Sequence, residues 1–209
     1  MFFRQKKRTG RLQKVARANT FTRIPKDRIG ALIGPEGKVK QALEKRLKVE
    51  LTIDSETGDI TIALVAEAED PSLLFRAQEV ITAIGRGFSP ERAFRLIDDE
   101  DLMLEIIDLR ELFGTSQSDL QRVKGRIIGQ EGKTRRIIEE LTEADVSIHG
   151  HTVAIIAAMD EMEVAREAIK MLLRGSMHST VYRYLHRKRR ELKKKKLEIW
   201  EKPYESAEK

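Results

Sequence analysis

Apolar positions along the chain recur either at every second residue, as in strands, or at every third or fourth residue, as in helices. Segments of these two kinds come in the same order in both halves of the chain. Phe21-Thr22-Arg23-Ile24 alternates with a period of two and predicts a short strand, which ends at Pro25. Pro25 is expected to be the first residue of a helix, because its missing N–H costs nothing at that position. In the first half, the spacing predicts helices over 26–33, 38–48 and 71–86 and strands over 49–53 and 59–65. The order is strand, helix, helix, strand, strand, helix.

The second half repeats this order after a connecting segment. Ser89-Pro90-Glu91 has the N-cap, first-turn proline and first-turn acid of a helix start, and residues 89–101 are interpreted as a linker with an acidic end. Gly175 is expected to end the last helix of this half. Residues 178–197 predict one more helix, which is very basic at its far end. The expected strands of this half lie at 102–109, 145–149 and 152–157, and the expected helices at 119–128, 134–142 and 160–174.

Matching residues indicate that the two halves are copies of one domain. Residues of the first copy match residues that lie 95 positions later in the chain as far as 49–53. From 77–81 onward the matching residues lie only 88 positions later. We expect the difference in the strand-to-strand loop, which is longer in the first copy (54–59) than in the second (150–151), because loops tolerate length changes. At the larger offset the pairs are Gly30 and Gly125, Ile33 and Ile128, Glu36 and Glu131, Lys38 and Lys133, and Glu44 and Glu139.

Each copy carries a Gly-x-x-Gly loop between its first two helices: Gly34-Pro35-Glu36-Gly37 and Gly129-Gln130-Glu131-Gly132. Glycine at both ends permits backbone angles that other residues resist and presents no side chain to an incoming strand. The helix that follows directs unpaired N–H groups and its positive dipole end at the loop. A phosphate of a nucleic-acid backbone is therefore the expected occupant.

The flanks of the loops supply cations and apolar surface. Ile33 with Ile53, and Ile128 with Ile148, are expected to form a groove floor for unstacked bases between the first helix and the middle strand. The candidate RNA-binding residues are Ile33, Gly34, Pro35, Glu36, Gly37, Lys38 and Lys40 in the first copy, and Arg126, Ile128, Gly129, Gln130, Glu131, Gly132, Lys133, Thr134, Arg135, Arg136 and Ile148 in the second.

The formal charge of +6 is unevenly distributed. Residues 1–17 hold seven Lys or Arg and no acid, and residues 187–196 hold eight against one Glu. The part between these two arms is therefore mildly acidic. Cationic arms on an acidic body suit long-range attraction to phosphates. The alternative is that both arms are solubilising tails.

Composition excludes several classes of protein. Zero cysteines exclude disulfides and thiolate metal sites. No apolar run approaches the roughly 18 residues of a membrane span, and residues 1–8 lack the apolar stretch of a secretory signal. A cytoplasmic protein without membrane attachment is the expected class.

The sequence motifs give little support for a catalytic site or a cofactor site. Gly132-Lys133-Thr134 ends like a phosphate-binding P-loop, but that motif needs a glycine at position 127, which is Ile127. His149 and His151 form the only close histidine pair and lack evident co-ligands. We therefore expect no catalytic residue, no metal and no cofactor.

The order β-α-α-β-β-α with Ile-Gly-x-x-Gly between the first helices resembles the type I KH domain, whose loop clamps about four nucleotides of single strand. The second half also resembles the Pno/Dim/Krr-type pre-ribosomal RNA-processing proteins, and the archaeal type is most similar because both loops keep their glycines. This resemblance is carried by residues 125–135, 162–168, 173–176 and 181–182.

The resemblance implies an α+β fold of two tandem type I KH domains, each a three-stranded sheet packed on three helices. The domains are expected at 18–88 and 102–175, with a basic arm at 1–17, the linker at 89–101 and a basic C-terminal helix and tail at 176–209. It also implies binding of single-stranded RNA near the 3′ end of small-subunit rRNA, alongside the endonuclease that matures this end and without catalysis. The alternative is a docking scaffold for a nuclease, a methyltransferase or a translation factor.

Two departures from the KH pattern bear on the site. Glu36 and Glu131 place an acid in loops where many KH domains carry Lys or Arg, and a carboxylate beside a phosphate repels it by about 1 kcal/mol or more. Pro35 also stiffens the first loop. The second domain is therefore expected to be the main RNA reader, and the first a weaker RNA site or a protein-docking surface.

Overall fold

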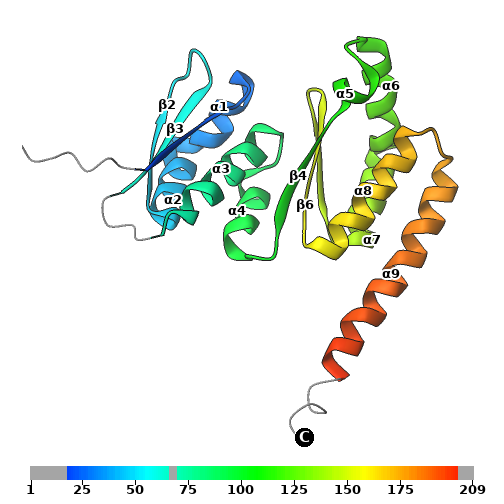
Figure 1. Cartoon of the computed structure of the whole chain (residues 1–209). Helices are drawn as coiled ribbons and strands as arrows, with labels where there is room; N and C mark the ends of the chain where they lie inside the picture. Colours follow the sequence, from blue (N-terminus) through cyan, green and yellow to red (C-terminus); the bar gives the residue numbers. More distant parts are fainter. Residues whose placement is uncertain (1–17, 66–69, 202–209) are drawn as a thin grey trace, which may run out of the picture.

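The computed structural model describes residues 18–65 and 70–201 and contains two units with the same order of elements (Figure 1). The arm at 1–17 lies outside the described residues, as does the end of the tail. The first unit consists of β1 (Asn19–Arg23), α1 (Lys26–Ile33), η1 (Pro35–Gly37), α2 (Lys38–Leu47), β2 (Val49–Ile53), β3 (Asp59–Leu64), α3 (Ser72–Gly85) and α4 (Pro90–Asp98). The second consists of β4 (Met103–Asp108), α5 (Leu109–Phe113), α6 (Gln117–Ile128), η2 (Gln130–Gly132), α7 (Lys133–Thr142), β5 (Asp145–His149), β6 (Thr152–Ala157), α8 (Met159–Leu173) and α9 (His178–Glu201).

Each unit has a three-stranded antiparallel sheet, with orders β1-β3-β2 and β4-β6-β5. The prediction that β2 and β5 are middle strands is wrong, since both lie at a sheet edge. The reason is that β1 pairs with the free side of β3, and β4 with the free side of β6. One side of β2 and of β5 is therefore left without a strand partner among the described residues.

Two local predictions also need correction. Pro25 is the N-cap of α1 and not its first residue. The short helix α5 was not predicted; Asp108 caps it by accepting the N–H of Arg110, and Gly114 ends it. A five-residue helix leaves too short a pattern for periodicity to detect.

Most of the length difference between the copies lies elsewhere than expected. Ile53 pairs with Ile60, and Ile148 pairs with Val153, so the hairpin accounts for only two of the seven residues. The other five lie in the connection from β3 to α3, which is far longer than the single residue between β6 and α8. The expectation that the strand-to-strand loop absorbs the difference is therefore wrong.

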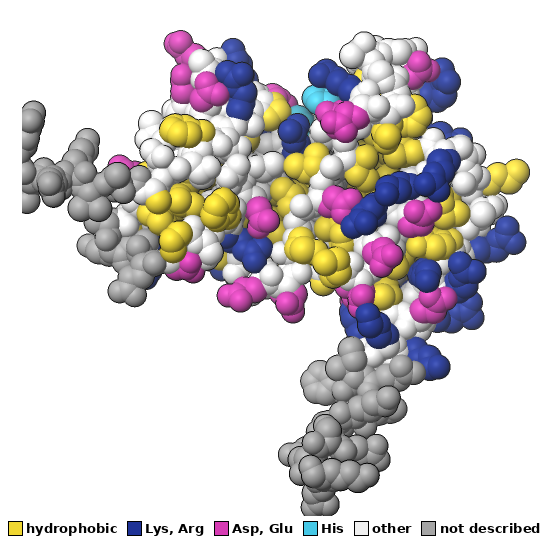
Figure 2. All heavy atoms as spheres, viewed as in Figure 1, with side chains coloured by type: hydrophobic (Ala, Val, Ile, Leu, Met, Phe, Trp, Pro, Cys, Tyr) yellow, Lys and Arg dark blue, Asp and Glu magenta, His cyan; other side chains and the backbone are white. Residues whose placement is uncertain are grey.

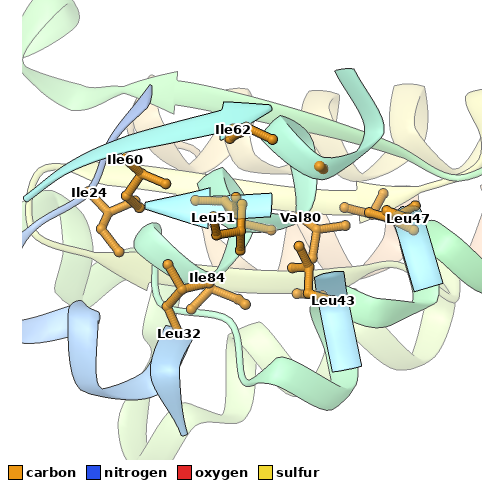
Figure 3. Packing of buried hydrophobic residues seen from close by; sticks show 14 of the residues in the cluster. Ile24, Leu32, Leu43, Leu47, Leu51, Ile60, Ile62, Val80 and Ile84 are labelled. Carbon is orange, nitrogen blue, oxygen red and sulfur yellow. The ribbon is translucent and has the colours of Figure 1, made fainter. Parts of the chain in front are cut away.

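The first core lies between the inner face of the first sheet and α1, α2 and α3. Ile60 and Ile62 of β3 point toward Leu32, Leu43 and Ile84 of the helices, all at most 1% exposed (Figure 3). Burial of these branched side chains supplies the main stabilisation of the unit. The same arrangement recurs around Val153, Ile155 and Ile138 in the second unit.

The two units pack in series, with α3 and α4 against the outer face of the second sheet (Figure 1). Ala154 and Ile156 of β6 belong to the hydrophobic cluster of the first unit, whereas Val153 and Ile155 belong to that of the second. Every residue of β6 is therefore buried, while β3 is buried only at alternate positions. The corresponding outer positions of β3, Thr61 and Ala63, are only half-buried.

Polar contacts also join the units. The Ser147 hydroxyl donates to the Arg86 carbonyl oxygen at 2.9 Å, and an Arg92 guanidinium nitrogen lies 2.7 Å from a Glu139 carboxylate oxygen. Gly87 makes the approach possible, because a Cβ atom there would lie 2.7 Å from Ser147 Oγ. The interface is thus specified by backbone contact as well as by apolar burial.

The repeated unit includes a fourth helix. In α1, Arg28 donates to the carbonyl oxygens of Ile84 and Phe88. In α6, Arg126 donates to those of Leu172 and Ser176, which stand 88 residues further along. Both arginines hold the turn that leads from the third helix to the fourth, so α4 and α9 occupy the same place in the repeat. The segment predicted as a linker therefore carries a helix whose Ala93 and Leu96 are buried.

Candidate nucleic-acid interface

The two Gly-x-x-Gly loops have the same backbone conformation. Gly34 and Gly129 both have φ 71° and ψ 176°, a region that residues with a side chain rarely adopt. The third residues, Glu36 and Glu131, have φ of 53° and 52°. Two chain segments with different sequences thus form one loop shape, which is the prediction made from the repeat.

The two glycines of each loop have different roles. A Cβ atom at Gly34 would lie 2.3 Å from Val39 Cγ2, and one at Gly129 would lie 2.2 Å from Thr134 Oγ1. The first glycine therefore lets the loop pack on the following helix. Around Gly132 nothing lies within 4 Å of a Cβ position, so this glycine leaves the outer side of the loop open.

The second loop offers more free amides than the first. The Gly132 N–H bonds to the Gly129 carbonyl at 3.2 Å, and that of Lys133 bonds to Gln130. In the described part of the chain, the amides of Gln130 and Glu131 have no intramolecular acceptor. The first loop has Pro35 in place of Gln130 and so lacks one of these two donors.

The charged side chains around the loops also favour the second loop as the anion site. Lys38 forms an ion pair with Glu36 at 2.8 Å, so the first loop neutralises its own cation. Lys133 is exposed, and no acid within the described ranges pairs with it. Arg136 donates to the Glu131 carbonyl oxygen at 2.9 Å and holds the open turn. An anion at the second loop would therefore meet free amides and an unpaired ammonium group.

Lys40 and Arg135 occupy equivalent positions, and each lies near a glutamate of its own helix. Lys40 lies 3.8 Å from Glu44, and Arg135 lies 3.7 Å from Glu139. Each glutamate also accepts an edge-strand N–H, Glu44 from Leu51 and Glu139 from Val146. These two predicted RNA contacts therefore help hold the helix to the edge strand.

Arg126 and Thr134 also have structural partners. Thr134 is 2% exposed and shares a hydrogen bond of 2.9 Å with the Tyr182 hydroxyl. Arg126 clamps the start of α9, and its own carbonyl oxygen lies 2.9 Å from His178 Nε2. The side chain of Thr134 is therefore engaged in packing within the protein.

A cavity of about 450 Å³ lies between the second loop and the start of α9. Tyr182 and His178 line it, and neither is among the candidate RNA-binding residues predicted from the sequence. Their four-residue spacing on a predicted helix, within the first two turns after the expected stop at Gly175, is the signal that could have found them. The other lining residues are Arg122, Gly125, Arg126, Gly129, Gln130, Lys133 and Thr134.

The predicted groove floor is partly accessible. Ile128 is 37% exposed, whereas Ile33, Ile53 and Ile148 are half-buried against their cores. The Lys124 ammonium reaches the Gly150 carbonyl oxygen at 3.0 Å, and so joins α6 to the turn after β5. This lysine stands one helical turn before Ile128 and was not predicted as part of the site.

Each histidine of the pair lies beside an aspartate, His149 beside one of the first unit and His151 beside one of the second. His149 Nε2 lies 3.1 Å from an Asp27 carboxylate oxygen, and His151 Nε2 lies 3.4 Å from one of Asp108. Among the described residues, no group of three or more His, Asp or Glu side chains is arranged to hold a metal ion. Within 18–65 and 70–201, no helix has both the length and the apolar content needed to cross a bilayer.

Comparison with known proteins identifies both units. Residues 22–99 match the family described as Krr1 KH1 domain, and residues 103–190 match the eukaryotic type KH-domain, type I, of the second PNO1 repeat. The KH domain-containing protein MJ0443 of Methanocaldococcus jannaschii is 46% identical, over 86% of this chain and 78% of its own. The chain belongs to the PNO1/Dim2p family of KH-domain proteins. Its α+β fold of two KH domains is thereby confirmed.

Other members of the PNO1/Dim2p family are linked to ribosomal RNA. The Pyrococcus horikoshii aDim2p, solved in a complex with a/eIF2alpha and rRNA, is 48% identical with a TM-score of 0.79; the match covers 85% of this chain and 97% of that one. The pre-rRNA-processing protein PNO1 of Coccidioides immitis is 26% identical over 76% of this chain. The match spans 62% of that PNO1, so the latter is the longer protein.

Proposed function

We propose that this protein binds single-stranded RNA through the second Gly-x-x-Gly loop and acts without catalysis in the maturation of the 3′ end of small-subunit rRNA. The observation that carries the proposal is the open turn at Gln130 and Glu131. It presents two free amides at the start of α7, next to the unpaired Lys133. The first loop lacks one amide and pairs its lysine internally, which supports a smaller role for the first domain.

The relatives support rRNA as the ligand. The P. horikoshii relative was solved with rRNA, and fungal relatives are named for pre-rRNA processing. The choice of the 3′ region and the cooperation with the endonuclease that matures it follow from the family resemblance and are part of the proposal. A cytoplasmic location, expected from the composition, is also part of it. The protein is expected to position the RNA, while another protein cleaves it.

A titration of the full chain with RNA tests this function. We expect a 3′-terminal fragment of small-subunit rRNA, unpaired and about 12 nucleotides long, to bind at least tenfold more tightly than the same sequence in a duplex. A KH loop admits single strands and contacts about four nucleotides, so pairing should block the site. Equal affinity for both forms, or for an internal rRNA fragment of the same length, would contradict the proposal.

Removing the free cation of the second loop should lower the salt dependence of binding. Each phosphate contact on a single strand contributes a slope of about −0.7 to the dependence of log K on log salt. We expect Lys133→Ala to make this slope shallower by about that amount. Lys38→Ala is the matched control, because Lys38 starts α2 at the equivalent position but pairs with Glu36. Equal changes in both variants would argue against a preference for the second loop.

A protein-docking role is the second candidate. The observation that favours it is the presence of the translation factor a/eIF2alpha in the complex of the P. horikoshii relative. An apolar protein interface should respond little to salt, whereas phosphate binding should weaken steeply. Both roles can coexist on different surfaces of the same chain.

A further inference from the structure

The C-terminal helix α9 is docked on the second KH domain along one side. Val181 and Leu185 are fully buried, and Leu192 is half-buried against the same cluster. Further along, Lys195 lies 2.6 Å from Asp160, and Lys196 lies 2.7 Å from Glu161. The hydrogen bond from Lys196 to the Glu161 carboxylate raises the pKa of that lysine. These contacts fix one face of the helix toward α7 and α8.

The opposite side of α9 carries an arginine face, which we define as Arg183, Arg187 and Arg190. All three side chains are exposed, and Arg183 and Arg190 pair with no acid in the part of the chain that the structure describes. Arg187 lies 3.8 Å from Glu191 and stacks over the Tyr184 ring at 6.0 Å. A shallow cleft of about 560 Å³ runs beside these residues and is also lined by Met171, Thr180, Tyr184 and His186. Lys and Arg side chains gather over this part of the surface in Figure 2.

Spacings of four and three residues place the arginine face on one stripe of the helix. Like charges at this spacing repel each other and destabilise a helix, and a polyanion bound across them removes that cost. Lys195 and Lys196 dock the helix through ion pairs, and Arg189 lies on the same docked side with its Nε buried. The outward stripe is made of arginines alone. The arginine fork matches the two free oxygens of a phosphate better than a lysine does.

The same helix reaches the second loop. Its first turn places His178 and Tyr182 in the cavity beside Gly129 and Lys133, and its next turns carry the arginine face. An RNA strand that leaves the loop along α9 would therefore meet the tyrosine and histidine first and the arginines next. Burial raises the pKa of the Tyr184 phenol, so this group stays a neutral hydrogen-bond donor in the cleft.

We propose that the arginine face of α9 is a second RNA-binding surface, which holds the phosphates of the strand beyond the nucleotides at the second loop. This inference rests on the proposed function, because it extends the same RNA. The occupant is the single-stranded RNA backbone, recognised by charge and by guanidinium–phosphate hydrogen bonds and not by base sequence.

The proposal is tested by comparing the binding of a long and a short RNA. Arg183→Gln with Arg190→Gln removes two charges without changing helix propensity much. We expect this variant to bind a 14-nucleotide RNA several-fold more weakly than the unaltered protein, with a salt slope shallower by about 1.4, twice the value for one phosphate. A 5-nucleotide RNA fills the loop alone and should bind both proteins equally.

The matched control is Arg174→Gln with Arg23→Gln. It removes two arginine charges as well, but both residues pair with exposed carboxylates, of Glu167 and Asp59. Its binding to either RNA should be unchanged, which separates a local contact from net charge. If the arginine variant binds the longer RNA as the control does, while Lys133→Ala still weakens binding, the arginine face is not a site but the loop remains one. If the unaltered protein binds neither RNA, both proposals fail.

Discussion

Replacing Gly129 by alanine is expected to lower the free energy of unfolding by at least about 2 kcal/mol. The residue has φ 71° and ψ 176°, where a side chain costs about 1–3 kcal/mol. The new Cβ atom would also lie 2.2 Å from Thr134 Oγ1 and 2.8 Å from the Thr134 amide nitrogen. Relief of this clash must move the start of α7 and disturb the bond between Thr134 and Tyr182. Urea unfolding followed by circular dichroism measures the loss.

Gly125→Ala is the matched control for this prediction. Gly125 lies inside α6, and nothing is within 4 Å of its Cβ position. Alanine at such a place stabilises a helix by roughly 0.5–1 kcal/mol. The two glycines are four residues apart, so the same substitution should have opposite effects. Similar destabilisation by both variants would show that the loop conformation is not the cause.

Introducing two aspartates into the second loop, Gln130→Asp with Glu131→Asp, is expected to weaken binding of single-stranded rRNA several-fold and leave the unfolding transition unchanged. A carboxylate placed about 4 Å from a phosphate costs about 1 kcal/mol or more near a protein surface. The fold should tolerate the change, because both positions are on the surface and aspartate is among the residues that accept positive φ. Fluorescence anisotropy with a labelled 3′-terminal fragment measures the affinity.

The first loop supplies the control with the same chemistry. Pro35→Asp with Glu36→Asp should change affinity by less than about twofold, because we expect this loop, with its Lys38–Glu36 pair, to contribute little binding energy. If the second-loop variant retains full affinity, that loop is not the site. A loss confined to the first-loop variant would move the site to the first domain.

The sequence was informative wherever structure depends on neighbouring residues. Strands 145–149 and 152–157 were predicted at their observed bounds, and α1 at 26–33, because alternation and helical spacing are local signals. The shape shared by the two loops also followed from the sequence, since glycine at both ends permits the positive φ that each loop needs.

The candidate site was only partly predictable. Lys133 and Arg135 look alike in the sequence, yet Lys133 is unpaired and Arg135 lies against Glu139. Thr134 belongs to a motif that suggests phosphate binding, but its hydroxyl meets Tyr182, 48 residues later. Whether a side chain is available to a ligand depends on partners that are remote in the chain, and a single sequence does not reveal them.

By itself the sequence determined the duplication, the order of elements and the position of both loops, because backbone propensity and glycine freedom act within a few residues. Only the tertiary structure decided that α3 and α4 cover the second sheet, that β2 and β5 lie at sheet edges, and which cations face solvent. These outcomes depend on which surfaces bury each other. The uninterrupted apolar run Val153–Ala157 agrees with burial on both faces, but it does not say that the first unit supplies the cover.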